Sequence, residues 1–260
     1  GGVAWHAHEM LWGFIATIAL AFLMTAGANW TGINPMSGKL LALACVLWAV
    51  ARIGFLLPWE TAFWIAMTSE LAFFLLGSSA MLRAVVISKN SRNYAVPGLL
   101  AGLGAMDALY LLTARGGDYL LLMQRFNAGL VVMALIALLI GRRVIPFFAM
   151  RAVHELSLPK QTETGWVQLG ACAVGVLGLL LGQPMPTAFG LGLAGVLAIV
   201  HIVSWKPWAV RSNALLWILY VGYAGVGIGL MLAAWAQVGL ALPRALPVHT
   251  IAMAGFSVMI

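Results

Sequence analysis

Charged residues are scarce in this chain. Asp, Glu, Lys and Arg together make up 8% of its 260 residues, while 63% are hydrophobic; soluble domains carry about 25% charged residues. So few charges cannot cover a surface in contact with water, which excludes a soluble globular domain. The surroundings are therefore largely lipid, where only helices and closed barrels satisfy every backbone hydrogen bond. The apolar runs are about 20 residues long, the length of a membrane-spanning helix rather than of a barrel strand.

Cysteine is equally rare, and the sequence lacks several common functional motifs. Cys45 and Cys172 both lie inside apolar runs, so we interpret them as small packing residues and not as a disulfide. Zinc-type cysteine spacing, a Walker loop, a catalytic triad and a dinucleotide fingerprint are all missing from the sequence. The net charge of +7 comes mostly from Lys and Arg in short loops. This pattern encodes membrane topology and does not indicate a nucleic-acid partner.

The apolar segments predict an all-α, polytopic transmembrane bundle that forms a single domain over residues 1–260, with membrane lipid as its main partner. Polar, Pro and Gly positions separate nine such segments. Their approximate ranges are 6–28, 39–57, 61–83, 93–115, 119–140, 166–183, 187–204, 212–237 and 247 to the end. Residues 141–165 are expected to form the longest loop. Because the chain begins with Gly-Gly and ends inside an apolar run, we expect a fragment that lacks helices at both ends.

The loop charges predict an orientation in the membrane. Ten Lys and Arg residues fall in alternate loops, and two fall in the loops between them. The ten are Lys39, Arg83, Lys89, Arg92, Arg142, Arg143, Arg151, Lys160, Lys206 and Arg211, and the two are Arg115 and Arg244. Cytoplasmic loops carry the excess of positive residues. We therefore expect the first helix to begin at the outer face, which is the periplasmic face in a bacterium.

Three of the five histidines are expected at that outer face: His6 and His8 at the start of the first helix, and His249 at the start of the ninth. On a regular α-helix, His6 and Glu9 share one face, while His8 points to nearly the opposite side. His6 and His8 therefore cannot both bind one metal ion from a regular helix. Either the start of the segment is not a regular helix, or each histidine serves a different site.

The neighbours of these histidines leave two interpretations open. Imidazole next to Met10 and Glu9 suits copper or haem iron, and Gly13, one turn further on, gives a flat macrocycle room to approach the backbone. Alternatively, Trp5 and Trp12 belong to an aromatic belt, and the polar side chains between them are merely solvated at the membrane interface.

Four ionisable residues lie inside apolar segments and form a second candidate set: Arg52, Glu70, Asp107 and Arg125. Charges within the membrane are costly and are usually paired or functional. They are expected either to form buried salt bridges that fix the helix packing, or to line a polar cavity that leads from the outer face to the histidines.

Three stretches closely resemble the NnrS family of bacterial membrane proteins. The first is the run from Trp5 to Phe14 with Asn29-Trp30-Thr31-Gly32, the second is Gly141 to Phe148, and the third is Leu216 to Tyr223 with the helix that begins at His249-Thr250. The resemblance implies an inner-membrane protein of about twelve helices, nine of them visible here. It also implies haem b, copper, and resistance to nitric oxide and nitrosative stress.

From this resemblance we expect His6, His8 and His249 to bind haem, and the same three residues with Glu9 to be candidate metal ligands. Arg52, Glu70, Asp107 and Arg125 would surround these ligands or carry protons. Tyr220 is a departure, because many relatives have histidine at that position. Two alternatives remain: a transporter of a metal or small solute whose path is lined by the buried charges, and a non-catalytic protective scaffold. The ligand would be a small gaseous molecule or a metal. Protein partners are not predicted.

Overall fold

The computed structural model describes residues 2–159, 162–239, 242–243 and 245–259. All regular structure in these residues is helical, which confirms the all-α class. Eight helical stretches in them are long and apolar enough to cross a membrane, as the polytopic bundle requires: Val3–Thr31, Gly38–Leu56, Glu60–Ile87, Ser91–Gly116, Tyr119–Ala152, Glu163–Leu181, Pro184–Ser204 and Ala214–Gln237. A shorter apolar stretch, Ala245–Met259, follows. Lys160 and Arg244, which entered the predicted topology, lie outside the described residues.

The first membrane-length stretch is not a uniform α-helix. It consists of α1 (Val3–His8), a π-helix (Glu9–Ala16) and α2 (Thr17–Thr31). A π-turn bonds residue i to residue i+5 and thereby changes which side chains share a face. His6 and His8 both lie within the α-helical α1, so the α-helical spacing assumed from the sequence holds between them, and it changes only from Glu9 onward.

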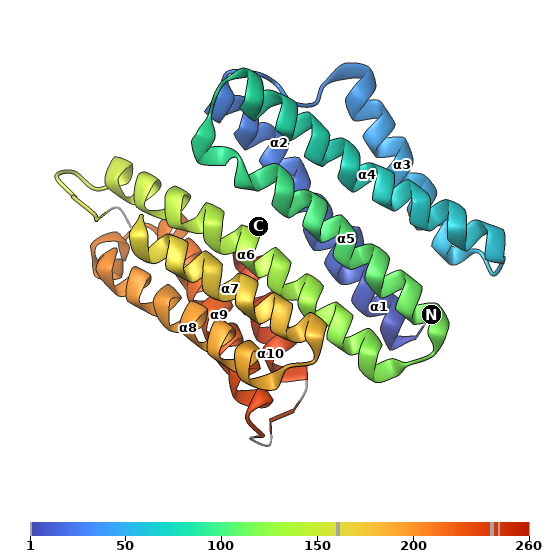
Figure 1. Ribbon diagram of the computed structural model, residues 1–260. Coiled ribbons are helices and arrows are strands. Elements are labelled where there is room, and N and C mark those ends of the chain that lie inside the picture. Colours follow the sequence, from blue (N-terminus) through green and yellow to red (C-terminus); the bar gives the residue numbers. More distant parts are fainter. Residues whose placement is uncertain (1, 160–161, 240–241, 244, 260) are drawn as a thin grey trace. The chain divides into compact units, whose positions relative to one another are not determined.

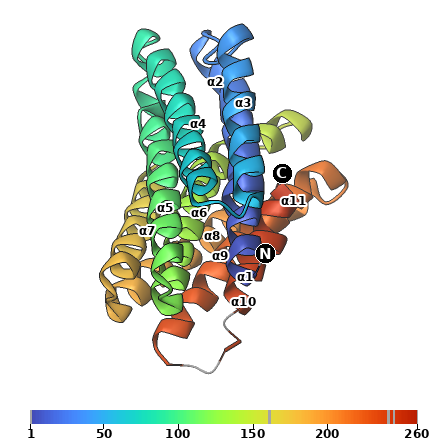
Figure 2. The same cartoon turned by 90° about the vertical axis from the view of Figure 1, so that its right-hand side faces the viewer.

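The chain divides into two compact units, and the boundary falls inside one helix. Unit 1, Gly1–Gly129, contains the first composite helix, α3 (Gly38–Leu56), α4 (Glu60–Ile87), a short 3-10 turn (Ser91–Asn93), α5 (Ala95–Gly116) and the first part of α6 (Tyr119–Ala152). In this unit α4 packs between α3 and α5 (Figure 2). The single domain expected over residues 1–260 stays a prediction.

Unit 2, Leu130–Ile260, is built on the remainder of α6. Its further elements are α7 (Glu163–Leu181), α8 (Pro184–Ser204), a 3-10 turn (Pro207–Val210), α9 (Ala214–Gln237), α10 (Ala245–His249), a second π-helix (Thr250–Phe256) and α11 (Ser257–Met259). Here α8 packs against both α7 and α9, and the π-helix packs on α9. Figure 1 shows α7 and α8 side by side. As in the first helix, the π-segment directly follows a histidine.

The predicted loop over residues 141–165 is wrong in its first half. Helix α6 continues through Arg142 and Pro146 to Ala152. Proline lacks a backbone N–H and therefore removes one helical hydrogen bond, but membrane helices tolerate this loss where neighbouring groups compensate. The guanidinium of Arg142 lies 5.4 Å from the ring centre of Trp166 on α7. The stretch Gly141 to Phe148 is therefore part of a helix that packs against its neighbour.

Candidate functional site

Five polar side chains meet inside unit 1, and we call them the buried charge cluster. His8 comes from the end of α1, Glu9 from the start of the π-helix, Arg52 from α3, Glu70 from α4 and Asp107 from α5. His8, Glu70 and Asp107 are 3%, 2% and 0% exposed, respectively. Side chains from four separate segments of the chain thus gather at one point in the helical interior.

His8 is the centre of this cluster, because both of its ring nitrogens face carboxylates. Its Nδ1 lies 3.1 Å from Oε1 of Glu9. Its Nε2 lies 2.9 Å from Oδ1 of Asp107 and 3.4 Å from Oε2 of Glu70. The imidazole therefore bridges three acidic side chains.

Arg52 closes the cluster on its other side. Its Nη1 donates a hydrogen bond to Oε2 of Glu9 at 2.8 Å, and its Nη2 forms an ion pair with Oε1 of Glu70. The guanidinium needs the absence of a side chain at Gly13, where a Cβ would lie 2.2 Å from Nη1. The room beside Gly13 is thus filled by Arg52 and is not open to a flat macrocycle.

An aromatic wall holds the His8 ring in place. The ring centres of Trp12, Phe55 and Tyr110 lie 5.6, 5.0 and 5.9 Å from that of His8. The indole Nε1–H of Trp12 donates to the carbonyl oxygen of Leu103 at 3.1 Å, which fixes the orientation of the indole. These rings leave the His8 imidazole little freedom to turn.

The buried charge cluster contains three of the four intramembrane charged residues singled out in the sequence. Arg52, Glu70 and Asp107 lie within the buried charge cluster. Arg125 lies half-buried in α6 of the same unit. The direct contacts of Glu70 and Asp107 with His8 were not predicted, because residue spacing does not show which helices are in contact.

His6, His8 and His249 have different environments. His6 is exposed on α1, whereas His8 is buried. His249 is exposed at the end of α10 in unit 2, where its ring Nδ1 lies 2.8 Å from the carbonyl oxygen of Ala245. An N–H at Nδ1 donates to that oxygen, which leaves Nε2 of His249 with its lone pair. The convergence of the three histidines on one face stays a prediction.

Unit 2 contains a buried polar network that the sequence gave no reason to expect. Nε2 of His201 lies 3.1 Å from Oγ1 of Thr164, and its Nδ1 lies 3.4 Å from the hydroxyl of Tyr223. The Tyr223 hydroxyl donates to Oε1 of Gln168 at 3.1 Å. His201 itself is fully buried.

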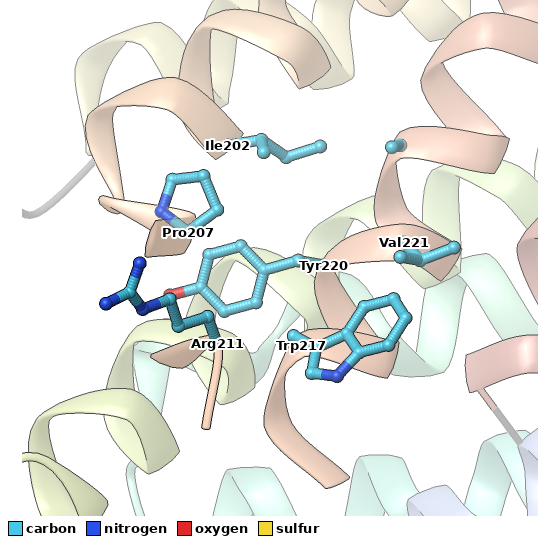
Figure 3. A pocket seen from close by; sticks show the side chains of 7 residues that line it. Ile202, Pro207, Arg211, Trp217, Tyr220 and Val221 are labelled. Carbon is cyan, nitrogen blue, oxygen red and sulfur yellow. The ribbon is translucent and has the colours of Figure 1, made fainter. Parts of the chain in front are cut away.

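An open pocket of ≈ 440 Å³ lies nearby in unit 2, with Tyr220 on its wall (Figure 3). The hydroxyl of Tyr220 donates to the carbonyl oxygen of Trp205 at 3.0 Å. The phenol of Tyr220 thus satisfies a backbone group. The lining is mostly apolar: Ile202, Pro207, Arg211, Trp217, Tyr220, Val221 and Ala224.

The comparisons with known proteins give one result. The family model described as NnrS protein matches residues 1–260, the whole chain. No curated protein and no solved structure matches the chain.

Proposed function

The chain belongs to the NnrS family, and we propose that it is a bacterial inner-membrane protein that binds haem b and copper and protects the cell against nitric oxide and nitrosative stress. The observation that carries this proposal is the family match over all 260 residues. Eight membrane-length helices in the described residues support it, because they provide the multi-pass scaffold that such a protein requires.

His249 offers the arrangement best suited to a haem ligand. The hydrogen bond from its Nδ1 to the Ala245 carbonyl fixes the ring and its tautomer, and the exposed ring leaves Nε2 accessible. A hydrogen bond of this kind on the other ring nitrogen is common for histidines that bind metals, and it raises their basicity. Bound haem would supply an iron atom that takes up nitric oxide.

His8 does not fit the role of an axial haem ligand in this arrangement. Its Nε2 faces Asp107 and Glu70, and three aromatic rings surround it. His6 is the more suitable histidine of the first helix, because it is exposed. Met10 is exposed one turn further on. Imidazole and thioether are ligands that copper accepts, which favours His6 and Met10 as the copper-binding pair.

The proposed orientation places the His6 and His8 end at the periplasmic face. The distribution of Lys and Arg supports this. Single cysteines introduced at Trp5 and at the exposed His154 of the α6–α7 connection would test it. A membrane-impermeant thiol reagent applied to intact spheroplasts should label the first and not the second. The reverse pattern would overturn the orientation.

Haem and metal analysis of the purified full-length protein tests the proposed function. The reduced-minus-oxidised spectrum should show b-type haem, and elemental analysis should show copper. His249→Ala should lower the haem content and His6→Ala the copper content. His154→Ala is the matched control, because that side chain is 93% exposed in a loop and its replacement should change neither. Protein free of haem and copper from replete cells would overturn the proposal.

Protection itself is tested in cells. A strain that lacks the gene should grow more slowly under a nitric oxide donor, and the wild-type gene should restore growth. A transporter would instead show metal- or proton-coupled flux in liposomes without stoichiometric haem. A passive scaffold would protect cells even with His249→Ala, which the proposal excludes.

A further inference from the structure

We propose that His8, Glu70 and Asp107 form a buried binding site for one divalent cation of the zinc, manganese or ferrous class, separate from haem and copper. One nitrogen or oxygen atom from each side chain lies within 4.8 Å of the other two. The site lies within unit 1 and draws its ligands from α1, α4 and α5.

The contacts of the His8 ring are the first argument. Both nitrogens face carboxylate oxygens, at 3.1 Å for Nδ1 and 2.9 Å for Nε2. A neutral imidazole has one N–H to donate and one nitrogen that only accepts. A doubly protonated imidazole donates to carboxylates from both nitrogens. When only Nδ1 carries a proton and donates to Glu9, the lone pair of Nε2 faces Asp107, and a metal cation can take the place of the second proton, shared between Nε2 and the carboxylate oxygens.

The distances agree with a shared ion. Ligand atoms held at about 2.1 Å from a tetrahedral zinc ion lie about 3.4 Å apart, and closer in six-coordinate geometry. The Nε2 atom of His8 lies 3.4 Å from Oε2 of Glu70 and 2.9 Å from Oδ1 of Asp107. The ligand atoms of Glu70 and Asp107 lie within 4.8 Å of each other, so binding of one ion requires these side chains to rotate towards it.

Two carboxylate oxygens at this point lack hydrogen bonds. They are Oε2 of Glu70 and Oδ2 of Asp107, and both are buried. Buried polar atoms in proteins nearly always have a partner, so an unsatisfied one calls for an explanation such as an ion. Here the unsatisfied oxygens belong to the two carboxylates that approach Nε2 of His8.

The net charge of the buried charge cluster favours a divalent cation. Three carboxylates, those of Glu9, Glu70 and Asp107, meet a single guanidinium, that of Arg52. A His8 ring that binds a cation through the lone pair of Nε2 is neutral, and the five side chains then carry two more negative than positive charges. Isolated charges are costly in a low-dielectric interior. One divalent cation balances the set.

The ligand types separate this site from the haem and copper of the proposed function. One imidazole and two carboxylates suit zinc, manganese or ferrous ions, whereas cuprous copper prefers thiolate and thioether. The aromatic wall of Trp12, Phe55 and Tyr110 leaves a macrocycle no access to His8. The Glu9 carboxylate behind Nδ1 orients the imidazole, as carboxylates commonly do for metal-bound histidines.

Elemental analysis of purified full-length protein tests the site. The wild type should hold about one zinc, manganese or iron atom per chain beyond the iron of haem. Asp107→Asn and Glu70→Gln should each lose that atom, while Glu9→Gln should weaken its binding about 10–100-fold. Glu60→Gln is the matched control, because this carboxylate of α4 is 68% exposed. It should keep the full content.

A second measurement covers variants that fold poorly. Chelator-treated wild type should gain thermal stability when zinc or manganese is added, and the Glu60→Gln control should gain equally. A haem spectrum of Asp107→Asn separates this proposal from the previous one, because haem should remain when the cation is lost. Wild-type protein whose only metals are haem iron and copper, with no stabilisation by added cation, would overturn the site.

Discussion

Trp12 and Gly129 approach so closely that position 129 has no room for a side chain. A Cβ there would lie 2.4 Å from Cζ2 of the indole. Since Trp12 also packs against His8, this close approach of α6 to the first helix supports one wall of the buried charge cluster. A side chain at residue 129 should therefore displace Trp12 and disturb the packing around His8.

We expect Gly129→Ala to destabilise the protein by about 1–3 kcal/mol, the usual cost of overpacking a core. Thermal unfolding in detergent would measure it. Gly102→Ala in α5 is the control, because a Cβ there meets nothing within 4 Å. Because Trp12→Leu removes the atoms that meet a Cβ at residue 129, Gly129→Ala should cost less in a Trp12→Leu background than in the wild type. Equal melting temperatures for Gly129→Ala and Gly102→Ala would contradict the packing argument.

Replacing Arg52 is expected to destabilise the protein more than replacing Arg115. Arg52→Leu leaves Glu9 and Glu70 without their partner in a largely buried setting, where breaking an ion pair costs about 3–5 kcal/mol. Arg115→Leu breaks an ion pair with Glu60 in which the two side chains are 38% and 68% exposed. That pair is worth at most about 1 kcal/mol. The difference between the two variants in detergent unfolding is the measurement, and a loss for Arg52→Leu no larger than for Arg115→Leu would refute the expectation.

The fold could be predicted because membrane-spanning helices are recognisable in a sequence as long apolar runs. The nine apolar segments correspond to the helices of the structure, since lipid imposes both their length and their apolar character. The exception is α6, where Gly141, two arginines and Pro146 resemble a helix end. The helix nevertheless continues to Ala152, and the guanidinium of Arg142 packs against the ring of Trp166 on α7. A contact of this kind depends on the tertiary structure and is invisible in a sequence window.

The candidate site was only half predictable. Because a charge in lipid is costly, Glu70 and Asp107 could be predicted to be paired or functional. Residue spacing, however, does not show which helices are neighbours. The α-helical spacing also placed Glu9 on a face remote from His8. In the structure the two side chains touch, at the point where the π-helix begins. The sequence left an irregular start open as one of two alternatives, but it gave no sign of a π-helix beginning at Glu9.

Tyr223 is expected to hold the polar network of unit 2 together. Tyr223→Phe removes the hydroxyl that donates to Gln168 and leaves the amide oxygen buried without that donor. The cost should be about 1–3 kcal/mol, the penalty for an unsatisfied buried group. Thermal unfolding in detergent measures it, with Tyr94→Phe as control because that phenol is 48% exposed. A stability loss shared equally by both variants would show that the network contributes nothing specific.

The last prediction concerns Gly225 of α9, which packs against the second π-helix. A Cβ at this position would lie 2.3 Å from the carbonyl oxygen of Ala254. Because this neighbour is backbone, it cannot move without displacing the π-helix that begins directly after His249. Gly225→Ala should therefore lower the melting temperature and, if His249 binds haem, also lower the haem content per chain. Gly170→Ala, on an open face of α7, should change neither. A destabilised Gly225→Ala protein with full haem content would separate the two effects and argue against His249 as the ligand.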